Sequence, residues 1–238
     1  MTDLTTVAGL ADALAREGFA FVPGAAMRPA LEAFGSLADW EGFAASWDDL
    51  GLDTYMADGG RYRKRRYAAF AADADGLRRK PHQPHYQSRD YNPLNGGVER
   101  WFAPIAPDIG AGESLTTILS FCRALFDRLD APPAWHIEVH QFRIEARADV
   151  LGHPTPEGTH QDGVDYVLVL LVGRRNVREG RTTVADLARR PLGDFVLTEP
   201  FDAALVDDNR VMHGVTPVAP VDPLEPGARD VLVVTFRR

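Results

Sequence analysis

The sequence lacks several features that mark particular classes of protein. Its 238 residues include one cysteine, Cys122, so an internal disulfide and a zinc-thiolate site are both excluded. It has no Gly-x-Gly-x-x-Gly or phosphate-loop motif, and none of its serines lies in a Gly-x-Ser-x-Gly elbow. Nucleotide chemistry and the common serine-hydrolase arrangement therefore have no support.

Basic residues and long apolar runs are also scarce. The 26 Lys and Arg residues are outnumbered by 34 Asp and Glu residues, which gives a net charge of −8. We therefore expect no nucleic acid partner, because such binding usually needs a surplus of basic residues on one face. The longest uncharged apolar run is Val167–Gly173, and the first twenty residues show no export pattern. These observations predict a cytoplasmic protein that does not cross a membrane.

What is present is an ordinary globular composition, with 45% hydrophobic residues. The length fits one domain of roughly 200–250 residues or two small ones, and the core needs no metal or disulfide for stability. Cys122 lies in the apolar-periodic stretch Leu115–Leu129, which is typical of a buried, inert thiol.

Helical spacing of apolar residues dominates the first half of the chain. Residues 6–16 predict a helix that ends at Gly18. Ala71–Ile109 is rich in Pro, Gly, Asn, Asp and aromatic residues, and we interpret it as ordered loops over a site. The other predicted elements are a strand at Phe19–Val22 and helices at Arg28–Leu37, Glu41–Leu50 and Glu113–Leu129.

After Pro133 the apolar spacing changes to the alternation of β-strands. Short strands without intervening helices predict a mainly β (α+β) fold, a double-sheet jelly roll with the N-terminal helices packed outside. We expect a single domain over 1–238, with a helical and loop part at 1–130 and a jelly-roll core at 134–238. The predicted strands are Trp135–Ile144, Val164–Val172, Arg181–Leu187, Asp194–Thr198, Ala203–Val206, Val211–Val218 and Asp230–Phe236.

The most specific local feature is the pair His160 and Asp162. In an extended segment residues i and i+2 point to the same face, so both side chains can reach one metal ion. His213, which lies 51 residues beyond Asp162, is the candidate third ligand. Two imidazoles and one carboxylate form the facial triad typical of non-haem Fe(II), with positions left open for co-substrate and oxygen. His-x-Asp alone is weak evidence, because chance supplies it in many proteins.

Arg229 strengthens this interpretation. It lies 16 residues beyond His213 and opens the last strand-like run. A planar guanidinium at the mouth of a barrel can hold a carboxylate through two hydrogen bonds. A dicarboxylate co-substrate that chelates iron at its other end would need such a partner.

Several stretches between Tyr62 and Phe236 match one known group of enzymes. They are Tyr86–Ser88, Tyr91–Gly97, Val139–Ile144, Pro154–Tyr166, Asp207-Asp208 with His213–Pro217, and Arg229–Phe236. With these stretches the sequence resembles the Fe(II)/2-oxoglutarate-dependent dioxygenases of the bacterial free-amino-acid hydroxylase, or isoleucine hydroxylase-like, family.

The resemblance implies a jelly-roll enzyme that hydroxylates a small molecule, a free aliphatic amino acid, with Fe(II), 2-oxoglutarate and O2. His160, Asp162 and His213 would bind the iron, and Arg229 the distal carboxylate of 2-oxoglutarate. Tyr166 follows Asp162 by four residues, on the same face of the expected strand, and is a further candidate contact to the co-substrate.

Two departures from the family pattern concern other positions. Many such enzymes have Ser two residues after the anchoring Arg, whereas this chain has Val231, so a second co-substrate hydrogen bond must come from elsewhere. Where the family usually reads Arg-x-Asn-Val-x-Gly-Gly-Glu, this chain ends the motif with Gly180-Arg181, which could alter substrate choice.

A free amino acid needs a cation for its carboxylate and an acceptor for its ammonium group. Alternation places Glu138, His140 and Phe142 on one face of the strand Trp135–Ile144, but it does not show which face is inside. An ion pair of Glu138 and Arg143 on the solvent side is equally open. The candidate substrate contacts are Gln141, Arg143, His140 and Arg66, with Glu138 also available.

Other clusters favour plainer interpretations. The basic run Arg61–Arg66 predicts a solvated edge or the lining of a pocket for a small anion. Asp207–Asn209 is typical of a turn rather than a second metal site. His82 and His85 favour a loop or surface location over metal binding.

Two other functions remain open at this point. One is a jelly-roll sensor that binds a metal or small ligand without turnover, and the other is a hydroxylase of peptide side chains. A homodimer is also left open.

Overall fold

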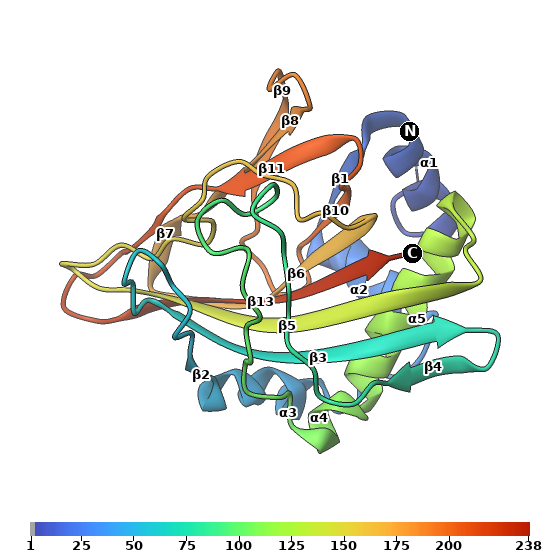
Figure 1. Ribbon diagram of the computed structural model, residues 1–238, viewed down its shortest axis with the longest axis horizontal. Helices are drawn as coiled ribbons and strands as arrows, with labels where there is room; N and C mark the ends of the chain where they lie inside the picture. Colours follow the sequence, from blue (N-terminus) through green and yellow to red (C-terminus); the bar gives the residue numbers. More distant parts are fainter. Residues whose placement is uncertain (1–2) are drawn as a thin grey trace.

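The computed structural model describes residues 3–238, and its main element is an eight-stranded antiparallel sheet (Figure 1). The strand order is β1-β10-β6-β13-β5-β3-β2, with β4 paired to β3. The strands are β1 (Phe19–Val22), β2 (Gly51–Leu52), β3 (Arg63–Asp73), β4 (Gly76–Arg79), β5 (Ala134–Ala146), β6 (Tyr166–Arg175), β10 (Ala203–Asp207) and β13 (Gly227–Arg237).

Two smaller sheets complete the jelly roll. One has the order β11-β8-β9 and the other pairs β12 with β7. Valines of both layers pack together, with Val184 and Val211 from the smaller sheet against Val167 and Val206 from the large one. These strands are β7 (Val177–Glu179), β8 (Arg181–Asp186), β9 (Pro191–Val196), β11 (Val211–Val215) and β12 (Val218–Pro220).

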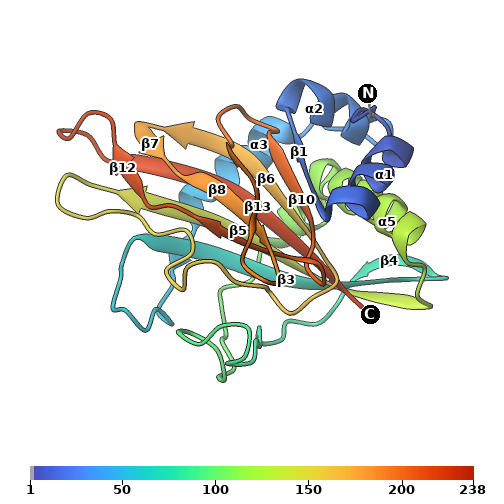
Figure 2. The same cartoon turned by 90° about the horizontal axis from the view of Figure 1, so that it is seen from above.

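The helices cover the outer face of the large sheet, away from the smaller sheets (Figure 2). The first helix begins where the hydroxyl of Thr6 accepts the N–H of Gly9, and it ends at Gly18, whose φ of 80° suits a residue without a side chain. The predicted jelly roll with outer helices is therefore confirmed. The helices are α1 (Val7–Glu17), α2 (Gly24–Glu32), α3 (Trp40–Ala45), the short 3-10 helix η1 (Ser46–Asp49), α4 (Pro107–Gly110) and α5 (Glu113–Leu129).

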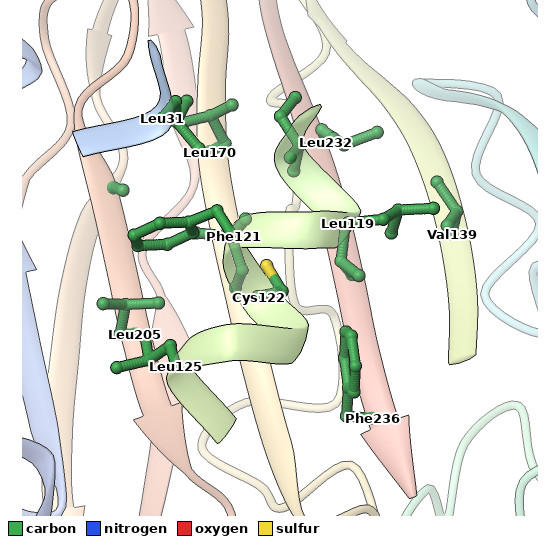
Figure 3. Close-up of a cluster of buried hydrophobic side chains, with 14 of the residues drawn as sticks. Leu31, Leu119, Phe121, Cys122, Leu125, Val139, Leu170, Leu205, Leu232 and Phe236 are labelled. Carbon is green, nitrogen blue, oxygen red and sulfur yellow. The ribbon is translucent and has the colours of Figure 1, made fainter. Parts of the chain in front are cut away.

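The main hydrophobic core lies between α5 and the large sheet (Figure 3). Leu119, Cys122 and Leu125 of α5 are almost completely buried. They pack with alternate residues of the strands, among them Leu205 and Phe236. The amphipathic face of α5, predicted over the same residues, therefore seals one side of the sheet.

The first half of the chain contains more strand than predicted. Residues 1–130 were expected to be helical and loop-like, yet β3 is an eleven-residue strand that pairs with β5 along its whole length. The alternation of β3 was hidden because its inward residues include Arg63 and Arg65 instead of apolar side chains. The loops predicted from Ala71 therefore begin only after β4.

No helix in the described residues is long and apolar enough to span a membrane.

We expect Leu119→Ala to lower the free energy of unfolding by about 2–5 kcal/mol, because it leaves a cavity in the core. Leu224→Ala is the matched control, since Leu224 is 89% exposed, and it should change stability by less than about 0.5 kcal/mol. Denaturant titration of both variants measures the difference. Equal stabilities would contradict this description of the core.

Candidate metal and co-substrate site

A cavity of about 270 Å³ lies inside the jelly roll, between the large sheet and β11. Strands β3, β5, β6 and β13 form its floor, and His213 and Val215 of β11 lie opposite. The loop after β4 closes one side with Tyr86, Gln87 and Tyr91, and it crosses in front of the large sheet in Figure 1. The predicted ordered loop over a site is therefore confirmed.

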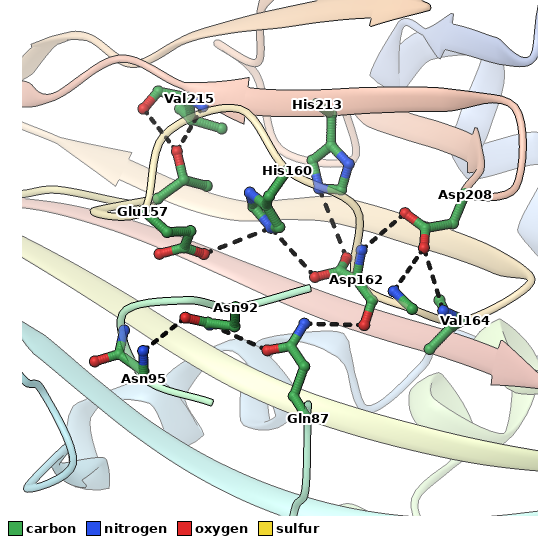
Figure 4. A network of polar contacts seen from close by, with 12 residues as sticks. Gln87, Asn92, Asn95, Glu157, His160, Asp162, Val164, Asp208, His213 and Val215 are labelled. Atoms are coloured by element: carbon green, nitrogen blue, oxygen red, sulfur yellow. Dashed lines mark hydrogen bonds and ion pairs between the residues drawn. The ribbon is translucent and has the colours of Figure 1, made fainter. Parts of the chain in front are cut away.

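The three predicted metal ligands meet at one end of this cavity (Figure 4). The Nε2 atom of His160 lies 3.3 Å from Oδ1 of Asp162, and Nε2 of His213 lies 3.7 Å from Oδ2 of the same carboxylate. Backbone hydrogen bonds join His160 and His213 in both directions. This pairing brings β11 and the loop before β6 together, although they are far apart in sequence.

The donor atoms of this triad fit a bound cation. Nδ1 of His160 lies 2.9 Å from the carbonyl oxygen of Gly158, which can only accept, so Nδ1 carries a proton. In neutral His160, Nε2 is then a bare acceptor facing the Asp162 carboxylate. Two facing acceptors are stable only with a cation or a proton between them.

The pKa values of the two histidines also agree with a cation bound at the triad. Burial opposes a charged His160, but the hydrogen bond and charge of Asp162 raise the pKa of His160 to about 9. Burial lowers the pKa of His213 to about 4, so this imidazole stays neutral and able to coordinate. The same fixed negative charge that attracts a proton here would attract a divalent metal ion.

Arg229 of β13 lies in the wall of the same cavity and is 2% exposed. Among residues 3–238, its Nε and Nη2 atoms have no hydrogen-bond partner. Burial, followed by the charge of Arg174, lowers the pKa of Arg229 to about 10, so it remains charged at neutral pH. A buried guanidinium with two unused donors fits a carboxylate that arrives with a ligand.

The arrangement agrees with a comparison against protein families. Residues 44–235 match the model of the 2OG-Fe dioxygenase family. The chain belongs to this family.

Individual relatives are similar over most or part of their length. A 3(1)-hydroxy-L-isoleucine 4-dioxygenase of Pantoea ananatis (strain AJ13355) is 28% identical over 94% of both chains. An L-isoleucine-4-hydroxylase of Bacillus thuringiensis is 28% identical over 64% of both chains. The crystal structure of a bsmA homolog from Methylobium petroleophilum PM1 has a TM-score of 0.88 and 37% identity, covering 98% of this chain and 93% of its own.

A second polar cluster occupies the middle of the dioxygenase cavity, around Glu138. The hydroxyl of Tyr67 donates to Oε1 of Glu138 at 2.8 Å, and His85 Nδ1 lies 2.9 Å from Oε2. Burial alone would raise the pKa of Glu138, but hydrogen bonds from His136, His140 and His85 hold it well below its usual range. Glu138 is therefore an ionised carboxylate with both oxygens engaged.

The positions of the imidazole protons distinguish this cluster from a metal site. His85, Glu138 and His140 have ligand atoms close enough to share an ion. However, Arg65 donates to Nδ1 of His140 at 2.7 Å, and the proton of neutral His140 must then sit on Nε2. Burial and Arg65 also lower the pKa of His140 to about 3. The atom that faces Glu138 is a donor and not a free ligand.

The basic run at Arg61–Arg66 contributes to the cavity. Arg63 pairs with the buried Asp53 at 2.8 Å, and the guanidinium of Arg65 lies 3.6 Å from the ring centroid of Phe102. Both arginines line the cavity, which fits the predicted pocket lining rather than a solvated edge.

Tyr166 does not lie where it was predicted. Its ring stacks on Phe126 of α5, with centroids 4.8 Å apart, so it faces the helical core and not the cavity. The prediction assumed an extended strand from Asp162, but β6 begins only at Tyr166 and the preceding residues bend. The proposed contact of Tyr166 with the co-substrate is therefore wrong.

Three of the four predicted substrate contacts also face away from the cavity. Gln141 donates to the hydroxyl of Ser46 under the helices, and Arg143 binds Asp230 through two hydrogen bonds of 2.7 Å. Arg66 binds Asp49 and the carbonyl of Pro104. Only His140 lines the cavity, because the even-numbered residues of β5 face inward.

Several residues of the cavity wall were not predicted from the sequence. Two of them are Glu157 and Arg100, and Arg100 belongs to no recognised ligand pattern and is revealed only by its burial. The position of Glu157, three residues before His160, was the one local signal available. His85 was assigned to a loop, correctly, but its side chain enters the cavity.

The loop that carries His160 and Asp162 is held by Asp208. Its carboxylate accepts the N–H groups of Asp162 at 2.9 Å, Gly163 at 2.8 Å and Val164 at 3.2 Å (Figure 4). Burial and the charge of Asp162 raise the pKa of Asp208 to about 7. The predicted turn at residues 207–209 thus also supports the backbone of the predicted ligand Asp162.

We expect Asp208→Asn to weaken metal binding about 10- to 100-fold, the range for partners that orient metal ligands. The asparagine amide has the shape of the carboxylate, but its NH2 group would face backbone N–H groups that need an acceptor. Asp207→Asn is the control, because the described hydrogen bond of that carboxylate is to Asn209 alone. Equilibrium dialysis with Mn(II) gives both dissociation constants, and an unchanged value for Asp208→Asn would remove this role.

Proposed function

We propose that this dioxygenase hydroxylates a free aliphatic amino acid. His160, Asp162 and His213 would hold Fe(II), and Arg229 would bind the distal carboxylate of 2-oxoglutarate. The observation that carries the proposal is the convergence of the triad and the unpaired Arg229 on one enclosed cavity. The relatives named for isoleucine and hydroxy-isoleucine substrates support the amino acid class.

When bound, Fe(II), 2-oxoglutarate and O2 would supply the oxidising chemistry that converts a C–H bond to an alcohol, with release of succinate and CO2. The residues of this chain supply position and exclusion of water. Arg229 fixes the co-substrate at one end, and the triad fixes the metal end. An apolar wall faces the space between them, formed by Val164, Val169, Val215, Val231 and Val233.

The enclosed shape of the cavity favours a small molecule over a protein side chain. The loop after β4 is tied across the cavity, since Gln87 donates to the carbonyl of Asp162 at 2.9 Å and accepts from Asn92 at 3.1 Å. A peptide would have to displace these bonds. Aerobic succinate release with Fe(II), ascorbate and 2-oxoglutarate, across a panel of free L-amino acids and peptides, tests the choice.

Stimulation of succinate release by one free amino acid is the expected result. Stimulation by peptides alone would overturn the amino acid class. Metal binding without stimulation by any compound in the panel would favour the sensor.

We expect His160→Ala, Asp162→Ala and His213→Ala each to abolish substrate-dependent succinate release, because each removes one ligand of the facial triad. The control is His82→Ala, which removes an exposed imidazole outside the cavity. Full activity in any purified triad variant would refute the metal assignment.

We expect Arg229→Ala to raise the apparent KM for 2-oxoglutarate about 10- to 100-fold, because a charge-assisted pair is lost. Arg175→Ala is the matched control, since Arg175 is an exposed arginine at the end of the neighbouring strand. Initial rates at varied 2-oxoglutarate give both values, and an unchanged KM would exclude Arg229 from the co-substrate site.

A further inference from the structure

The cavity contains a second buried arginine that lacks an ionic partner. Arg100 is 2% exposed and lines the cavity, and among residues 3–238 it forms no ion pair. Its Nη2 atom makes one long hydrogen bond of 3.5 Å to Gln87, and its Nε has no partner. A buried guanidinium in this state is costly unless an anion completes it.

Other cavity arginines are already neutralised or assigned. Arg63 is paired with Asp53, and Arg65 donates to His140 while its guanidinium contacts two aromatic rings. Arg229 has the position expected for the co-substrate. Arg237 also lines the cavity but is exposed to solvent. Arg100 is therefore the buried cation that remains for a second carboxylate.

The cavity also contains one incompletely used carboxylate. Glu157 has a side chain that is 8% exposed, and its Oε2 atom has no hydrogen-bond partner in the described part of the chain. Its Oε1 atom lies 3.5 Å from Nε2 of His160, which places the group beside the metal end of the cavity. Glu138 differs, because both of its oxygens already have partners.

Arg100 and Glu157 lie within electrostatic range of each other. The charge of Glu157 is one of those that raise the pKa of Arg100 against the effect of burial. No direct bond joins the two groups, so each retains unused hydrogen-bonding capacity toward the space between them. A cation without an ionic partner and a carboxylate with one unused oxygen, both lining the same cavity, are complementary to a zwitterion.

We infer that Arg100 binds the α-carboxylate and Glu157 the α-ammonium group of the amino acid substrate. This inference rests on the proposed function and assigns two residues that select a free α-amino acid over its acylated or decarboxylated relatives. Neither residue enters the chemistry at the oxidised carbon, so both are specificity determinants.

Binding of analogues to the wild-type protein tests the inference without mutation. The probes are L-isoleucine, 3-methylpentanoic acid, which lacks the ammonium group, and 2-methylbutylamine, which lacks the carboxylate. Calorimetric titration uses protein loaded with Mn(II) and 2-oxoglutarate under anaerobic conditions, so that no turnover occurs. We expect each analogue to bind at least about 10-fold more weakly than L-isoleucine, the loss of one charge-assisted pair.

Two variants then assign the groups. Arg100→Gln should weaken L-isoleucine binding about 10- to 100-fold and leave 2-methylbutylamine unchanged. Glu157→Gln should weaken L-isoleucine similarly and leave 3-methylpentanoic acid unchanged. Arg100→Lys should recover part of the loss, and the exposed Arg147→Gln is the control. Mn(II) affinity, measured in parallel, should be unaffected by Arg100→Gln.

The outcomes separate this inference from the proposed function. If amino acids stimulate succinate release but both variants bind L-isoleucine as tightly as wild type, the zwitterion assignment is overturned and the function stands. If 3-methylpentanoic acid or 2-methylbutylamine binds as tightly as L-isoleucine to wild type, the assignment is also overturned. If only peptides stimulate release, the proposed function itself fails.

Discussion

The whole structure depends on a large sheet whose two faces have opposite character. Strand β5 shows this most clearly between His136 and His140, where it is paired on both sides and consecutive side chains enter opposite faces. Ile137 and Val139 enter the core beneath α5, whereas Glu138 and His140 enter the cavity. A shift of one residue in register would exchange these sets and place charge in the core. The apolar packing between the helices and the sheet therefore determines which side chains of β5 enter the cavity.

The cavity is stable because most of its buried charges satisfy one another. Asp53 neutralises Arg63, and a shell of imidazoles and one tyrosine hydroxyl surrounds Glu138. Buried polar groups left without partners are rare in folded proteins, so those that remain are informative. Here they include atoms of Arg229, Arg100 and Glu157. We expect small molecules of complementary charge to bind where these buried charged groups have no partner within the protein.

Local patterns in the sequence were sufficient for part of this picture. The helix at Glu113–Leu129 and the pair His160 and Asp162 depend on spacings of a few residues, and the structure places them as predicted. The inward face of β5 depends on tertiary packing, which explains why Gln141 and Arg143 were included among the candidate substrate contacts. Strand β3 was missed because its inward positions carry arginines, and Arg100 became visible only through its burial.

The single thiol of the chain acquires a further meaning from its position. Cys122 sits in the middle of α5, fully buried against the large sheet, and burial raises the pKa of its thiol (Figure 3). Reagents that need a thiolate can reach it only when the helix separates from the sheet. The rate of alkylation of the native protein thus measures how often the core opens. Modification of Cys122 would therefore report separation of α5 from the large sheet, the sheet whose other face forms the cavity floor.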